Sequence, residues 1–127
     1  MQPLDEPALR VTMMPRDTNV HGTIFGGIIL SYIDQAGAVA ARRHGCFNVV
    51  TVAMDRVVFH EPVYVGDLVT FRTRTVHIGR TSMRIRVTVE AMRYADNSRV
   101  TVTDAEVVYV NVGPDRRPTP IPGTGAA

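Results

Sequence analysis

Lysine and tryptophan are absent from this 127-residue chain, and cysteine occurs once. All 14 basic residues are arginine, so the surface offers forked donors suited to phosphate, yet the net charge of +2 leaves no polybasic strip. With 6% aromatic residues and no Trp, a stacking platform for nucleic acid is not supported, and we expect no nucleic-acid partner. The single Cys46 excludes an intrachain disulfide and fits a reducing compartment.

Long uninterrupted apolar runs are also missing. The longest apolar stretch, residues 24–41, contains Asp34, Gln35 and three glycines, which favours a buried core helix over a membrane span. The first ten residues carry two acids and no apolar core of a secretory signal. We therefore expect one domain over residues 1–127, located in the cytoplasm and not bound to a membrane.

The residue pattern predicts one long helix followed by strands of period two. Arg42, Arg43 and His44 favour the negative end of the helix, and Gly45 can adopt the left-handed conformation that ends it. The expected elements are a strand over Leu9–Met14, a helix from about Ile24 or Gly26 to Arg43, and strands over Phe47–His60, Leu68–Ile78, Ser82–Tyr94 and Arg99–Val112.

This order predicts an α+β fold in which about five antiparallel strands curl around one central helix. The turns between the last three strands have hairpin length, so a meander is the simplest topology. The helix is apolar on nearly every side and should be covered by protein on most sides. In the last strand the apolar phase changes, which predicts a bulge near Thr103 to Ala105 or an edge buried by a partner. Residues 113–127 should be mostly coil.

Asp34 stands out because it interrupts the apolar helix with an acid. An ionised carboxylate is costly to bury unless it is paired, hydrogen-bonded or used in chemistry, and perturbed carboxyls concentrate at functional sites. Two alternatives stay open from the helix alone: an acid at a solvated edge, or an acid satisfied by a neighbouring arginine.

Gly26 and Gly27 open the same helix and allow another group to approach the backbone closely. The first amides of a helix have no partner inside it, so they can bind a phosphate or stabilise an oxyanion. Asp34 lies seven residues beyond Gly27, about 10 Å along the helix, which is too far for both to reach one carbonyl. This spacing predicts a dimer in which the two groups come from different subunits.

Three segments together resemble a known family. DTNVHGTIFGGIILSYIDQAG, VVTVAMDRVVFHEPVYVGDLVTF and VHIGRTSMRIRVTVEA are similar to the hotdog-fold acyl-CoA thioesterases, and most of all to their YciA-like branch. The resemblance covers about residues 9–112. It implies hydrolysis of acyl-CoA to a free acid and CoA, in a homodimer with shared active sites that assembles further as a trimer of dimers.

The resemblance also implies roles for particular residues. The family's catalytic carboxylate falls on Asp34, its motif asparagine on Asn19 and its helix-start amide on Gly27, with Gly26 allowing close approach. Its CoA-side motif falls on Gly79, Arg80, Thr81 and Ser82, a segment that on its own is simply a hairpin turn. CoA is part of the substrate, so no cofactor is expected, and the four histidines show no metal-ligand spacing.

Several alternatives stay open at this point. Asp34 could act as a general base on water or attack the thioester directly to form an anhydride. Asn19 could serve only to stabilise its loop. An acyl-CoA hydratase or dehydratase of the same fold needs a histidine beside the acid, and only His21 could supply it. A non-catalytic acyl-CoA-binding protein is the other rival.

Overall fold

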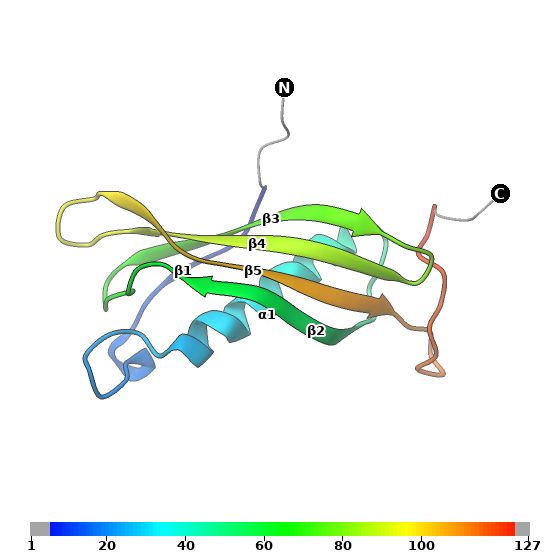
Figure 1. Ribbon diagram of the computed structural model, residues 1–127, viewed down its shortest axis with the longest axis horizontal. Coiled ribbons are helices and arrows are strands. Elements are labelled where there is room, and N and C mark those ends of the chain that lie inside the picture. The colour runs from blue at the N-terminus through cyan, green and yellow to red at the C-terminus, as the bar shows by residue number, and fades with distance from the viewer. Residues whose placement is uncertain (1–5, 124–127) are drawn as a thin grey trace, which may run out of the picture.

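The computed structural model describes residues 6–123 (Figure 1). It contains one α-helix, a short 3-10 helix and five strands. These elements are β1 (Glu6–Thr12), the 3-10 helix η1 (Pro15–Asp17), α1 (Gly26–Arg42), β2 (Val49–Phe59), β3 (Leu68–Ile78), β4 (Ser82–Met92) and β5 (Arg99–Asn111). The strand β1 begins at Glu6, before the predicted Leu9, because Glu6 and Pro7 already pair with β3. It ends before the predicted Met14, since Met13 hydrogen-bonds Gly66 and Asp67 of the turn before β3.

The five strands form one antiparallel sheet in the order β1-β3-β4-β5-β2. The predicted meander of the last three strands is confirmed. The strand β2, however, pairs with β5 and not with its neighbour in sequence, β3. The chain therefore crosses from one side of the meander to the other between β2 and β3, and β2 becomes an edge strand.

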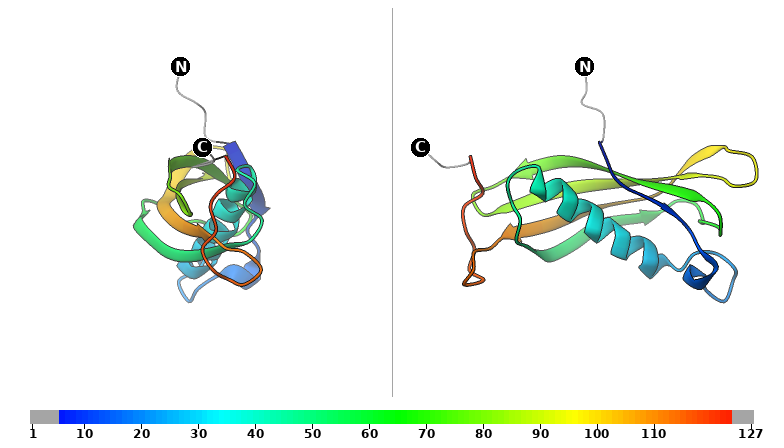
Figure 2. Two further views of the ribbon diagram at one scale, coloured as in Figure 1. Left: turned by 90° about the vertical axis from the view of Figure 1, so that its right-hand side faces the viewer. Right: turned by 180° about the vertical axis from the view of Figure 1, so that it is seen from behind.

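The helix α1 lies across the concave face of this curled sheet (Figure 2). Its buried face contacts the core, whereas Ser31, Gln35 and Arg42 are exposed. The single chain therefore covers the helix on most sides and leaves one strip of it exposed. The buried helix residues are Ile29, Ile33, Ala36, Gly37, Ala40 and Ala41.

The strand β5 contains the bulge that its sequence predicts, slightly earlier than expected. Val89 pairs with Thr103 and Glu90 with Thr101, so Val102 is the extra residue. Val102 and Thr103 are both buried, and the strand changes phase at this point. The bulge turns Thr103 and Tyr109 toward the helix, and it leaves Glu106 on the outer face of the sheet.

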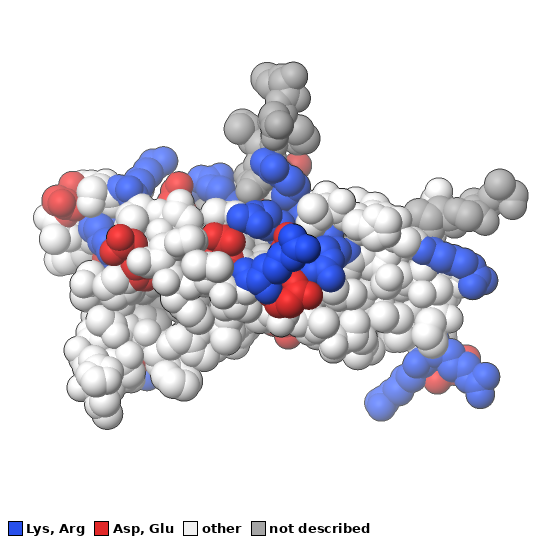
Figure 3. All heavy atoms as spheres, in the orientation of Figure 1, with Lys and Arg blue, Asp and Glu red and all other residues white. Residues whose placement is uncertain are grey.

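Charged side chains gather over the middle of that outer face (Figure 3). Arg84 lies 2.7 Å from Asp55 and 3.0 Å from Glu106, and Arg86 lies 3.0 Å from Asp104. The arginines cover Glu106, which is only 5% exposed. Since these acids face away from the helix and are paired, they are not candidates for the chemistry of the concave side.

Candidate active site

Asp34 lies midway along α1, half-buried, on the flank of the helix that faces β2 and β5. Its Oδ1 accepts a 2.6 Å hydrogen bond from the hydroxyl of Thr51 on β2. The hydroxyl of Tyr109 on β5 donates to the Asp34 carbonyl oxygen at 2.6 Å and lies 3.3 Å from Oδ1. Among residues 6–123 no cationic side chain pairs with this carboxylate. Two hydroxyl groups hold it, and the neighbouring arginine that the sequence left open as a partner is not there.

Tyr109 reaches the helix because the facing residue is a glycine. A Cβ atom built on Gly37 would stand 2.7 Å from two ring carbons of Tyr109 and closer still to its hydroxyl oxygen. Burial, together with the nearby Asp34 carboxylate, raises the pKa of Tyr109 far above its ordinary value. The hydroxyl therefore stays protonated and remains a donor to Asp34 at any working pH.

The amino end of α1 forms the second part of the site. Gly26 and Gly27 belong to the first turn of the helix, and their amides have no acceptor within it. The first hydrogen bond at this end is donated by the next amide, that of Ile28, to the Phe25 carbonyl at 3.0 Å. A Cβ on Gly26 would lie 3.5 Å from the ring of Phe59 on β2. Gly26 is thus bordered by an aromatic ring from the edge strand, whereas a Cβ on Gly27 would meet the ring of Phe25.

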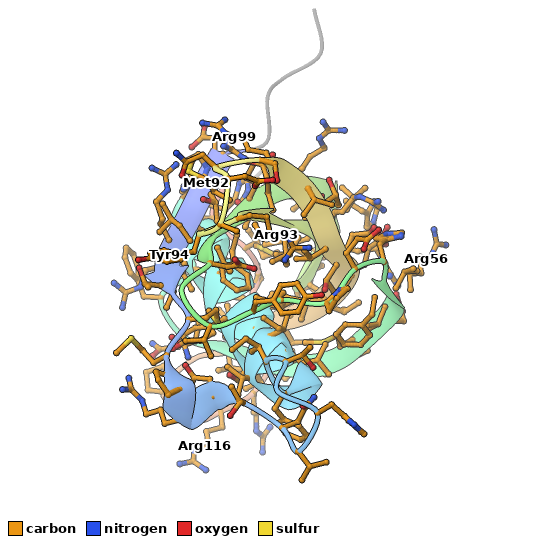
Figure 4. All side chains as sticks on the ribbon, turned by 90° about the vertical axis from the view of Figure 1, so that its left-hand side faces the viewer. Arg56, Met92, Arg93, Tyr94, Arg99 and Arg116 are labelled. Atoms are coloured by element: carbon orange, nitrogen blue, oxygen red, sulfur yellow. The ribbon has the colours of Figure 1, made fainter. Side chains whose placement is uncertain are left out.

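Asn19 organises the loop that leads into α1. Its Oδ1 accepts from the His21 amide at 2.8 Å and from the Thr23 amide at 3.3 Å, and its Nδ2 donates to Thr23 Oγ1 at 3.0 Å. In Figure 4, which looks along the molecule from this end, the loop lies in front of the helix. Asn19 therefore contacts its own loop in the single chain, and neither Asp34 nor Gly27 is among its partners.

The turn Gly79–Ser82 joins β3 and β4 at the other end of the sheet. Its Gly79 amide donates to the Ser82 carbonyl at 2.8 Å. The Arg80 carbonyl accepts from the Ile121 amide at 2.8 Å, so the segment after β5 is tied to this turn, while the Arg80 side chain is exposed. The structure therefore brings Asp34 neither to this turn nor to the glycine pair within one chain.

A cavity of about 350 Å³ opens at the start of α1, and a wider groove of about 630 Å³ lies near its end. The groove is lined by residues that include Ala38, one turn beyond Asp34, and the arginines Arg42 and Arg116. Among residues 6–123, no three His, Cys, Asp or Glu side chains are placed to hold a metal ion. No helix in the same part of the chain is long and apolar enough to cross a membrane.

Comparison with known proteins agrees with this architecture. A family model described as the thioesterase superfamily matches residues 21–94. The acyl-CoA thioester hydrolase YciA of Salmonella typhimurium is 40% identical over 126 residues, which is 97% of this chain and 95% of that protein.

Solved structures give the same result. A hexameric hotdog fold thioesterase of Campylobacter jejuni is 47% identical with a TM-score of 0.87, covering 91% of this chain and 90% of that one. A mutant of a hexameric broad specificity acyl-coenzyme A thioesterase is 36% identical with a TM-score of 0.91, covering 96% and 90%.

One helix packed on a curled five-stranded antiparallel sheet is the hotdog fold, as the sequence predicts. The chain belongs to the thioesterase superfamily, in its branch of hotdog-fold acyl-CoA thioester hydrolases. The predicted family and enzyme class are therefore confirmed, whereas the roles of individual site residues stay predictions.

Packing of Tyr109 against Gly37 should be sensitive to a single added methyl group. We expect Gly37→Ala to lower the free energy of unfolding by about 3 kcal/mol, because overpacking moves the ring or the helix. Urea unfolding at one fixed protein concentration measures the change. Gln35→Ala, at an exposed position of the same helix, is the control and should change it by less than about 0.5 kcal/mol. Equal stability of G37A and wild type would contradict the tight contact.

Proposed function

We propose that the chain hydrolyses acyl-CoA thioesters in active sites shared between two subunits, with Asp34 from one and the Gly27 amide from the other. One observation supports this arrangement above all. The edge strand β2 contacts both halves of the site: Thr51 bonds Asp34, and Phe59 borders Gly26. The two contacts lie eight residues apart along one strand, on either side of Asp55.

Antiparallel pairing of β2 with a second copy of itself would join the two halves. If the two-fold axis passes near Asp55, Thr51 of one subunit lies opposite Phe59 of the other. The partner subunit's Asp34, held by its own Thr51, then approaches Gly26 and Gly27. Exposed apolar side chains support such pairing, since Val50, Val52, Val58 and Phe59 are all about half exposed in the single chain.

In the proposed reaction, Asp34 accepts a proton from a water molecule whose oxygen attacks the thioester carbon. The Gly27 amide stabilises the negative charge that develops on the carbonyl oxygen, an interaction worth about 3 kcal/mol in comparable sites. The carbon–sulfur bond then breaks, and the proton passes to the departing CoA sulfur. Thr51 and Tyr109 fix the orientation of the carboxylate, which leaves Oδ2 as the oxygen free to act as base.

Asn19 and the CoA side of the site complete the proposal. Asn19 shapes the loop before α1, and in the assembled dimer its amide could also face the thioester oxygen. The nucleotide of CoA would lie at the Gly79–Ser82 turn, beside the groove that contains Arg42 and Arg116, because guanidinium groups bind phosphate with two parallel hydrogen bonds.

The assembly is the remaining part of the proposal. The relative from Campylobacter jejuni is described as hexameric, which supports a trimer of dimers for this chain. A reducing, cytoplasmic location fits Cys46, which is buried as a free thiol and has its pKa raised by burial.

Loss of the acid should abolish turnover without loss of assembly. We expect Asp34→Asn to lower kcat by at least about a thousandfold in a thiol-release assay, since it removes the base and leaves a similar shape.

A mixture of two inactive variants in one oligomer tests whether the active sites are shared between subunits. Gly27→Pro removes the amide donor, and 1:1 co-expression of the two inactive variants should restore about a quarter of wild-type activity, because half of the dimers are mixed and each has one intact site. No recovery in mixed oligomers would contradict a shared site.

The register of β2 pairing can be tested by cross-linking. Asp55→Cys should form a disulfide-linked dimer under mild oxidation, because residues at a two-fold axis between antiparallel strands bring their Cβ atoms within bonding range. Non-reducing electrophoresis and mass spectrometry detect the product. Glu90→Cys, on the outer face of the central strand β4, is the control and should stay monomeric in the gel. Equal cross-linking of both variants would contradict the register.

Arg80 should matter only for substrates that contain the nucleotide. We expect Arg80→Glu to raise KM for acyl-CoA about tenfold or more, with little effect on short acyl thioesters that lack the nucleotide, because the exchange repels phosphate. Arg99→Glu, at an exposed position on the distant β4–β5 hairpin, is the matched control. Equal effects of R80E on both substrate classes would show that the turn is not part of the CoA site.

A further acyl-CoA substrate in the same assay distinguishes thioester hydrolysis from the rival reaction, hydration of a double bond. Incubation with crotonyl-CoA should release free thiol and not hydrate the double bond. Loss of the enoyl absorbance without thiol release would instead favour the hydratase alternative.

A further inference from the structure

An exposed aromatic residue, Phe47, lies in the segment that joins α1 to β2. The residue is 67% exposed and lines the groove of about 630 Å³ near the end of α1. The guanidinium carbon of Arg42 lies over the ring, 5.8 Å from its centroid. Arg42 thus stacks against an aromatic ring that remains largely open to solvent.

The charged side chains that line this groove are all basic. Arg42 and Arg116 are among its lining residues, and no acidic residue is. Within residues 6–123 neither arginine forms a salt bridge, whereas the neighbouring Arg117 lies 4.0 Å from Asp115. Unpaired guanidinium groups are able to bind phosphate through two parallel hydrogen bonds.

The groove lies between two segments that are far apart in the sequence. The loop before β2 supplies Phe47 and Asn48, and the turn after β5 supplies Pro114 and Arg116. The Val112 amide donates to the Asn48 carbonyl at 3.0 Å, which joins the two segments. Both segments lie at the end of the molecule where α1 ends (Figure 2). An open aromatic ring, an amide side chain and free guanidinium groups therefore border one groove.

We propose that the adenine base of CoA stacks on Phe47, while Arg42 and Arg116 bind the phosphate groups. This inference rests on the proposed function, because it takes CoA as part of the substrate. Ala38, one turn beyond Asp34, also lines the groove, and Arg42 lies eight residues beyond Asp34, about 12 Å along the helix. The groove therefore leads away from the acid in the direction that the nucleotide end of CoA requires.

The chemistry of a nucleotide matches the groove in two respects. A purine presents a π face that stacks on an aromatic ring, and loss of such a ring weakens binding about tenfold. Arginine suits both parts of a nucleotide, because its plane stacks on rings and its forked donors bind phosphate. Phe47 has no charge, so its effect should be confined to the base and should vanish for a thioester that lacks the nucleotide.

Kinetics on two thioesters separate the base from the rest of the substrate. We expect Phe47→Ala to raise KM for hexanoyl-CoA about tenfold with kcat unchanged, and to leave KM for hexanoyl-pantetheine within about twofold of wild type. Phe47→Tyr keeps the ring and should keep the wild-type KM. Tyr94→Ala removes an aromatic residue that is 81% exposed on the distant β4–β5 hairpin, and it should change neither KM.

A fluorescence titration tests the same contact without turnover. The chain contains no Trp, so Phe47→Trp introduces a single indole at the proposed stacking surface and keeps a ring there. We expect CoA and adenosine 3′,5′-bisphosphate to quench its fluorescence, because a stacked purine quenches indole, and pantetheine to leave it unchanged. Tyr94→Trp places the single indole on the distant hairpin, where none of the three compounds should quench it.

Several results would overturn the inference and leave the proposed function intact. One is a KM for hexanoyl-CoA that F47A leaves unchanged, or raises no more than it raises KM for hexanoyl-pantetheine. Another is F47W fluorescence that CoA does not quench while calorimetry shows CoA binding to the same variant. Quenching by ATP at lower concentrations than by CoA would assign the groove to a free nucleotide instead.

Two further outcomes are distinguished by separate measurements. Dissociation of the F47A oligomer in size-exclusion chromatography, with KM unchanged, would place the ring under a second subunit and overturn the inference. A wild type that releases no thiol from hexanoyl-CoA would refute the proposed function, whereas the F47W titration with CoA would still decide whether the base stacks at this position.

Discussion

The hydroxyl of Tyr109 is the contact on which the candidate site depends. It crosses from the central part of the sheet to the backbone of α1 and lies within hydrogen-bonding range of both the carbonyl and the carboxylate of Asp34. It can do so only where the helix presents Gly37. The ring therefore ties the orientation of the acid to the packing of the helix on β5, and Thr51 from β2 supplies the second donor.

Most of the fold could be predicted because its signals are local. The alternation along residues 82–94 and the glycine after Arg42–His44 each act within a few residues, and the observed strand and helix lie at those places. The place of β2 in the sheet could not be predicted in this way. Its valine-rich sequence fits a central strand, but it lies at the edge, where Val50 and Val52 are exposed in the single chain. Their apolar character makes sense only with a covering partner.

The site was less accessible to sequence reasoning than the fold. Asp34 and the glycine pair stand out as an acid and two flexible residues in an apolar helix. Thr51 and Tyr109 do not stand out, because both residue types are ordinary in strands and their roles depend on contacts 17 and 75 residues away along the chain.

In the proposed mechanism, the distance between the acid and the helix-start amides is the reason why two subunits share each active site. A rigid helix keeps Asp34 and Gly27 about 10 Å apart, so no side-chain rotation within one chain can bring both to a single carbonyl. The two-fold pairing proposed for β2 would solve this problem twice, once for each subunit, and would bury the same exposed valines that make the edge unfavourable in water. In that arrangement the energy that stabilises the dimer also positions the catalytic groups. A weakened β2 edge would then lower activity through lost geometry, even in a chain whose own core is intact.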